Sequence, residues 1–99
     1  MTKVTVSGFL IAPTLEASDR ASEVLPDHIR LSRAEHGCLK FEVERSQSDP
    51  ARFALFEVFR DQEAYAAHQA RTRASLWWTV TSGFERDFSV SRERAGKPD

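Results

Sequence analysis

The run Arg52–Phe59, RFALFEVF, constrains the fold of this 99-residue chain more than any other stretch. Its β-branched and aromatic residues favour a strand, but polar and apolar side chains barely alternate along it. The odd-numbered positions carry three large apolar side chains and Glu57, and the even-numbered positions after Arg52 are all apolar. A strand that is apolar on both faces needs cover on both, so the fold must bury this strand from two sides.

The neighbouring patterns predict the elements around this strand. Further strands are expected at Lys3–Ile11, Cys38–Glu44 and Phe84–Val90, where β-branched, aromatic or alternating residues cluster. A first helix follows Pro13, with Thr14 or Ser18 as its N-cap, and a second helix follows the N-cap Asp61. Ser75 can cap one more short helical piece.

Each helix carries a signal that bears on its length. The first should bury a stripe at 3.6-residue spacing and stop at Gly37. That stripe contains Ala21, Val24, Leu25, His28, Leu31 and Ser32. Pro26 removes a backbone N–H and clashes with the preceding turn, which predicts a kink or two shorter helices. In the second helix Tyr65 and His68 share one face, and the segment 70–75 predicts a break.

The resulting order, strand–helix–strand–strand–helix–strand, is the ferredoxin-like split βαβ arrangement of the α+β class. Both helices then lie on one face of a single antiparallel sheet. The other apolar face of Arg52–Phe59 has no cover within the chain, and an exposed apolar patch of this kind favours association. We therefore expect a homodimer whose two sheets face each other as a dimeric α+β barrel. One domain is expected over residues 1–91, with 92–99 as a charged tail.

Composition limits the partners. Fourteen Lys and Arg residues against fifteen Asp and Glu give a net charge of −1, which offers no reason to expect nucleic acid or an anionic membrane as a partner. No apolar run could span a bilayer, and the N-terminus lacks the pattern of a signal peptide. A single cysteine, Cys38, permits no intrachain disulfide, so a cytoplasmic protein is expected.

Two residues are candidates for acid–base catalysis. Glu57 lies in an apolar strand, where burial would raise its pKa, unless Arg33, Arg86 or a backbone donor pairs with it. His68 is a candidate because an unperturbed histidine titrates near neutral pH, and a hydrogen-bonded or surface role is the alternative. His28 lies in the apolar stripe as a core or pocket histidine. A metal site built from His28, His68 and Glu57 has no support in their spacing, and no metal is expected.

Aromatic residues suggest a pocket for a flat ligand. Trp77 and Trp78 are adjacent and point to different sides of a helix, so at least one can stack on an aromatic ring. Core packing is the alternative for both. The predicted substrate-binding set consists of Trp77, Trp78, Tyr65, Phe41, Phe9, His28 and Arg33.

Two motifs together resemble the antibiotic biosynthesis monooxygenase family of small dimeric α+β barrel proteins. The first is R-x-E-x-G-C-L-x-F from Arg33 to Phe41. The second is F-x-L-x-E-x-F-x-D from Phe53 to Asp61, followed by Tyr65 and His68. The similarity runs from about His28 to Trp78, roughly half of the chain.

The resemblance implies a cofactor-independent monooxygenase that acts with O2 on a small electron-rich aromatic, quinol or polyketide-like substrate. His68 or Glu57 would be its base. Haem-degrading relatives use an Asn, a Trp and a His where this chain has Ser7, His68 and Trp78, so haem is not expected. The same fold also hosts isomerases, and a non-catalytic small-molecule binding module remains a further alternative.

Overall fold

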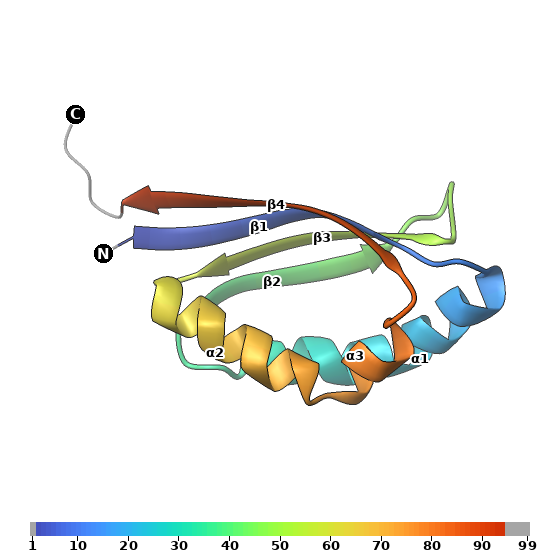
Figure 1. The fold of residues 1–99 in the computed structure, drawn as a ribbon, viewed down its shortest axis with the longest axis horizontal. Coiled ribbons are helices and arrows are strands. Elements are labelled where there is room, and N and C mark those ends of the chain that lie inside the picture. The colour runs from blue at the N-terminus through green and yellow to red at the C-terminus, as the bar shows by residue number, and fades with distance from the viewer. Residues whose placement is uncertain (1, 95–99) are drawn as a thin grey trace.

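The structure, a computed structural model, describes residues 2–94, in which four strands and three helices follow one another (Figure 1). The strands are β1 (Thr2–Ile11), β2 (Cys38–Arg45), β3 (Arg52–Phe59) and β4 (Glu85–Arg94). The helices are α1 (Leu15–Arg33), α2 (Gln62–Arg73) and α3 (Leu76–Val80). The predicted α+β class and ferredoxin-like element order are confirmed, with α3 as the expected short piece between α2 and β4.

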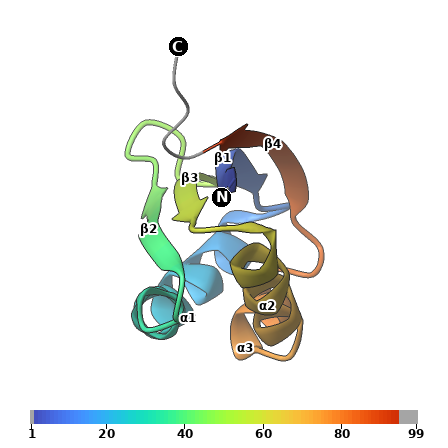
Figure 2. The same cartoon turned by 90° about the vertical axis from the view of Figure 1, so that its left-hand side faces the viewer.

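The strands form one antiparallel sheet in the order β2-β3-β1-β4. The doubly apolar strand β3 is therefore central, paired on both sides. All three helices lie on one face of the sheet (Figures 1 and 2). Viewed end-on, α1 lies below β2, while α2 and α3 lie toward β4 (Figure 2).

Each helix begins at a residue whose side chain caps it. The side-chain oxygens of Thr14, Asp61 and Ser75 each accept a hydrogen bond from the backbone N–H three residues later, at 3.0, 2.8 and 3.3 Å. These bonds satisfy amide groups that the helix itself leaves without partners. Ser18, the alternative cap, is fully buried instead, and its hydroxyl donates to the carbonyl of Pro50.

Helix α1 differs from its prediction in three respects. It runs unbroken through Pro26, because Ala21, Leu25 and His28 pack on the sheet on either side of the proline. The alternative of two shorter helices is therefore wrong. The helix also ends at Arg33 with Ala34 as its C-cap, before Gly37 is reached. Leu31, expected in the buried stripe, is 42% exposed.

Three later segments also depart from their patterns. Helix α2 continues to Arg73, so the predicted break is wrong; alanine and arginine are good helix formers. An irregularity between Cys38 and Lys40 leaves Leu39 exposed, away from the buried Phe41 and Val43. Strand β4 extends beyond Val90 to Arg94, and residues 95–99 of the expected tail lie outside the described residues.

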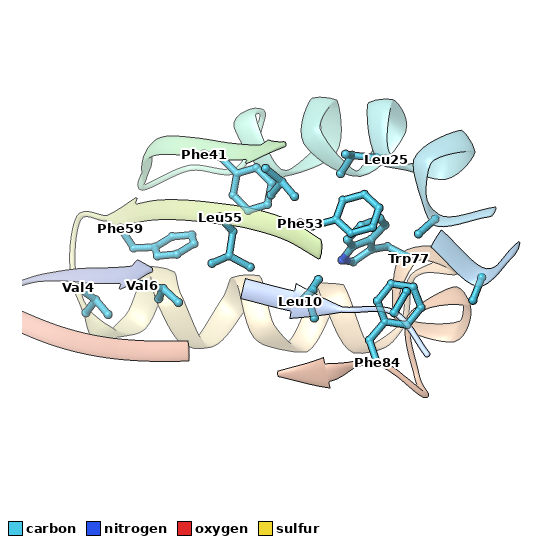
Figure 3. Close-up of a cluster of buried hydrophobic side chains, with 14 of the residues drawn as sticks. Val4, Val6, Leu10, Leu25, Phe41, Phe53, Leu55, Phe59, Trp77 and Phe84 are labelled. Atoms are coloured by element: carbon cyan, nitrogen blue, oxygen red, sulfur yellow. The ribbon is translucent and has the colours of Figure 1, made fainter. Parts of the chain in front are cut away.

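The hydrophobic core fills the space between the sheet and the helices (Figure 3). Phe41, Phe53 and Phe59 are almost completely buried there. Gly8 allows β1 and β4 to pair closely: its φ is +145°, and an added Cβ would lie 2.1 Å from the carbonyl oxygen of Asp87. The inward-facing position between Val6 and Leu10 therefore carries no side chain.

Among residues 2–94, no helix or loop covers the opposite face of the sheet. On β3, Phe56 is 38% exposed, Ala54 is exposed and Val58 is half-buried. This apolar surface lacks the second layer that its sequence predicts. None of the helices in residues 2–94 is long and apolar enough to cross a bilayer.

Candidate active site

A cavity of about 220 Å³ opens between the inner face of the sheet and helices α2 and α3. Its floor comes from all four strands, and Leu55 and Phe88, which lie opposite Gly8 on the neighbouring strands, both line it. Its lining residues are Val6, Leu10, His28, Val43, Leu55, Glu57, Tyr65, His68, Gln69, Thr72, Arg73, Trp77, Trp78, Arg86 and Phe88. Most of this wall is apolar or aromatic, as in small-molecule sites, and a few polar groups converge inside it.

Helix α2 supplies one wall of the cavity. Because Asp61 fixes where the helix begins, residues at 3.6-residue spacing fall on the face toward the sheet. Tyr65, His68 and Thr72 lie on this face and line the cavity. The shared face predicted for Tyr65 and His68 is therefore present.

Glu57 projects from the centre of β3 into the cavity. It lies opposite Val6 on one side and Phe41 on the other, and it is 8% exposed. Burial raises the pKa of Glu57 to about 8, and the nearby carboxylate of Glu35 adds to the rise. The side chain is thus a neutral carboxylic acid at pH 7. Its anticipated partners bond elsewhere: Arg33 donates to the carbonyl of Phe41, and Arg86 contacts Thr81.

His68 lies between two carboxyl groups. Its Nδ1 lies 2.9 Å from Oε1 of Glu35, and its Nε2 lies 3.7 Å from Oε1 of Glu57 and 3.3 Å from the hydroxyl of Thr72. Burial lowers the pKa of His68, and Glu35 opposes that shift only in part. With both members neutral at pH 7, the contact between His68 and Glu57 is no ion pair. Nδ1–H then donates to Glu35, and Nε2 keeps its lone pair toward the cavity.

A polar chain behind His68 holds Glu35 in place. Nε of Arg71 donates to Oε2 of Glu35, and another guanidinium nitrogen of Arg71 donates to the buried hydroxyl of Ser32 at 2.8 Å. The carboxylate of Glu35, in the loop after α1, therefore contacts His68 and Arg71 of α2, and Arg71 is tied in turn to Ser32 of α1. The orientation of the imidazole is fixed by groups from three segments of the chain.

His28 reaches the cavity from α1. Its ring stacks on Trp77 at 5.0 Å with an interplanar angle of 10°, and its centroid lies 6.1 Å from that of His68. Burial, with His68 and Arg71 nearby, lowers the pKa of His28 to about 3, so the ring is neutral. Its Nδ1 is buried without a hydrogen-bond partner among the described residues. A satisfied core histidine, one of the two expectations for His28, is therefore wrong.

The structure brings six of the nine predicted site residues to the cavity: Glu57, His68, His28, Tyr65, Trp77 and Trp78. Phe41 lies behind them, its ring 5.4 Å from that of His68. Phe9 lies on the opposite side of the sheet, with Arg52 above its ring. Arg33 is also outside the cavity. Across residues 2–94, no group of three His, Cys, Asp or Glu side chains is placed to hold a metal ion.

Sequence reasoning missed several polar residues of the site. Glu35 belongs to the first family motif, but nothing in the pattern indicates its contact with His68, 33 positions away. Arg71 and Arg73 fall in the segment 70–75, where a break predicts solvated side chains, with binding of a substrate carboxylate or enolate as the alternative. Thr72 could have been found, since it follows His68 by four residues on one helical face.

Cys38 is half-buried, and burial raises the pKa of its thiol.

Comparison with known proteins bears on this geometry. A family model described as antibiotic biosynthesis monooxygenase matches residues 8–76, which confirms the resemblance noted in the sequence. The comparison with curated proteins found no significant match.

Several solved structures share the fold. A protein from Nitrosomonas europaea that carries the same family name has a TM-score of 0.73 at 20% identity, covering 98% of this chain and 92% of its own. Another antibiotic biosynthesis monooxygenase has a TM-score of 0.69 at 26% identity and covers 98% of this chain and 100% of its own. A protein from Bacteroides thetaiotaomicron with that family name has a TM-score of 0.71 at 21% identity, covering 98% and 91%.

Proposed function

Because the chain belongs to the antibiotic biosynthesis monooxygenase family, we propose that it is a cofactor-independent monooxygenase acting with O2 on a small electron-rich aromatic, quinol or polyketide-like substrate. The observation that carries the proposal is the neutral pair of His68 and Glu57 inside an aromatic cavity. One member offers a lone pair and the other offers a proton, which are the two functions that the chemistry needs.

His68 is the base in this proposal. Its Nε2 takes a proton from a phenol, or from a carbon acid such as the methylene of an anthrone. Glu35 stabilises the imidazolium that forms, because its carboxylate accepts the hydrogen bond from Nδ1 at 2.9 Å. Glu57, protonated at pH 7, donates to the oxyanion of the substrate or to the peroxide formed later.

The substrate supplies all the electrons. For a methylene substrate, the carbanion passes one electron to O2, and the carbon radical and superoxide combine into a peroxide anion. This anion takes up the proton that the base first removed and becomes a hydroperoxide. Loss of the second C–H proton and of hydroxide, which takes up a proton to become water, leaves a ketone. Oxidation of CH2 to C=O releases four electrons, and O2 accepts four as one carbonyl oxygen and one water.

The dimensions of the cavity favour a compact substrate. Its volume of about 220 Å³ lies below the usual range for drug-sized ligands, roughly 300–1,000 Å³. A system of one to three fused rings suits a site walled by Trp77, Trp78 and Tyr65, where aromatic faces can stack. Apolar walls also keep water away from the reactive peroxide.

We further propose that two copies of the chain pair through the uncovered sheet face. The support is the exposed Phe56 beside the half-buried Val58 and Phe9, all on the side of the sheet opposite the three helices of residues 2–94. When this apolar surface packs against an identical copy, both faces of β3 are removed from water, one by the helices and one by the second chain.

Oxygen consumption tests the proposed activity. Anthrones, dihydroxynaphthalenes and other quinols are added to the purified protein without any cofactor, and O2 is followed with an electrode. His68→Asn should lower the rate by about a hundredfold or more, whereas His36→Asn, which alters an exposed histidine bonded to Arg60, should not. If His68→Asn matched the wild type on an accepted substrate, His68 would not be the base.

The same assay separates the alternatives. An isomerase would convert its substrate under strict anaerobiosis, which a monooxygenase cannot do. A binding module would bind aromatics and show a raised melting temperature without product or O2 uptake. Either result would contradict the proposed oxygenation.

A further inference from the structure

Charge is distributed unevenly along the cavity: its inner end is neutral and its mouth is positively charged. Glu57, His68 and His28 at the inner end are buried and neutral at pH 7. The exposed part of the lining contains Trp78 and Phe88, at 36% and 38% exposure, together with two arginines, Arg73 and Arg86. No carboxylate from residues 2–94 lines the mouth, so a ligand that enters meets positive charge first and a neutral acid–base pair last.

Arg86 is held in a fixed position at this mouth. One guanidinium nitrogen, Nη2, donates to the carbonyl and the hydroxyl of Thr81 at 3.1 and 3.0 Å. The guanidinium carbon lies 4.7 Å from the centroid of the Trp78 ring. These contacts order the side chain before any ligand arrives, and pre-ordering lowers the cost of binding.

The remaining donors of Arg86 are unused. Among residues 2–94, no carboxylate forms an ion pair with Arg86, and its Nε and Nη1 have no hydrogen-bond partner, whereas Arg71 is paired with Glu35. Partial burial lowers the pKa of Arg86, which remains protonated in the physiological range. A partly desolvated cation with free donors is a suitable receptor for an anion.

Arg73 adds a second charge to the same rim. It lies in the last turn of α2, is exposed, and has no ion-pair partner within the described part of the chain. It lines the cavity together with Arg86, although the two residues come from different elements. Two unpaired guanidinium groups thus border one small aromatic opening.

We propose that the substrate of this site is an aromatic carboxylate, whose carboxylate is bound at the mouth by Arg86 with help from Arg73. The ring then lies along Trp78, and the carbon or hydroxyl to be deprotonated points inward to His68. This proposal rests on the proposed function for its chemistry and adds the class of substrate. A planar carboxylate conjugated to a ring matches the fork of a guanidinium already stacked on an aromatic side chain.

Binding under anaerobic conditions tests the proposal without turnover. Calorimetry compares a hydroxynaphthoate with its methyl ester, which has the same ring and no charge. The wild type should bind the acid at least about tenfold more tightly than the ester. Arg86→Met should abolish that preference, Arg86→Lys should restore it in part, and Arg73→Met should weaken it. Arg20→Met, on the exposed side of α1, is the matched control.

Equal binding of acid and ester by the wild type would overturn the proposal, as would a preference that survives in both methionine variants. If Arg86→Met fails to fold because Thr81 loses its contacts, Arg73→Met and Arg86→Lys still decide the question. Oxygen uptake keeps the two proposals apart. Turnover of neutral phenols but not of aromatic acids would refute this inference alone, whereas acid-selective binding without any O2 uptake would refute the monooxygenase proposal alone.

Discussion

Nδ1 of His68 lies 2.9 Å from Oε1 of Glu35, so the histidine of α2 is oriented by a residue of the loop between α1 and β2. The contact fixes which ring nitrogen carries the proton, so that Nε2 presents its lone pair to Glu57 and to the hydroxyl of Thr72. It is the structural basis for treating His68 as a base rather than as a buried structural histidine.

Glu35→Gln tests this orientation. The variant removes the charge that stabilises the imidazolium, so kcat should fall by at least about tenfold while KM changes little. Steady-state O2 uptake on an accepted substrate gives both constants. Glu63→Gln, an exposed change in the first turn of α2, should leave both unchanged. Loss of binding with unchanged kcat would show that Glu35 acts on the pocket and not on the base.

Glu57 should make stability depend on pH. Its pKa is about 8 in the folded chain against 4.5 for an unperturbed glutamate, so between these values the folded protein holds a proton that the unfolded chain has lost. The contribution of Glu57 to stability therefore falls as pH rises from about 4.5 to about 8. Glu57→Gln removes this dependence. Urea unfolding across that range should therefore show the free energy of unfolding of the variant rising relative to that of the wild type as the pH increases. Parallel curves would contradict the raised pKa.

His28 should cost stability in the free protein. An unpartnered, buried imidazole nitrogen is unfavourable, so His28→Phe, which keeps a ring against Trp77, should raise the unfolding free energy by about 1 kcal/mol.

The stability gained by His28→Phe should be larger at acidic pH. The folded pKa of His28 is about 3, so below about 6.5 only the unfolded chain takes up the proton, and the contribution of His28 falls further as pH drops. Urea unfolding near pH 5 and pH 8 measures the difference. His36→Phe is the exposed control, and a His28→Phe variant that lost stability at the lower pH would contradict this account.

Phe56 should control the association of two chains. Phe56→Glu places a charge in the centre of the uncovered sheet face and should convert a dimer into a monomer, as measured by light scattering during gel filtration. Leu76→Glu, at a 62% exposed leucine on α3, is the control and should remain dimeric. A wild type that is monomeric at all concentrations would contradict the proposed dimer.

Local patterns predicted most of the fold. The period-two alternation and the caps Thr14, Asp61 and Ser75 depend only on neighbouring residues, and they placed the strands and helices close to their observed bounds. The alternative of two shorter helices at Pro26 was wrong, because packing on both sides of a proline can hold a helix together.

The site was predictable only in part. Glu57 and His68 stand out as polar residues at apolar positions, and both line the cavity. The Glu35 contact and the anchoring of Arg86 on Thr81 arise from tertiary packing, which no spacing reveals. Phe9 illustrates the limit of a strand pattern: alternation shows that β1 has two faces but does not show which one lies toward the helices.

Isotopically labelled O2 tests the central claim most directly. The protein, stripped of metals with a chelator and supplied with no cofactor, is given a substrate that it consumes, and the product is examined by mass spectrometry. The account predicts one labelled oxygen atom per product molecule, formed rapidly by the wild type and about a hundredfold more slowly by His68→Asn. Product that carries oxygen from water, or a rate that does not change with His68, would contradict it.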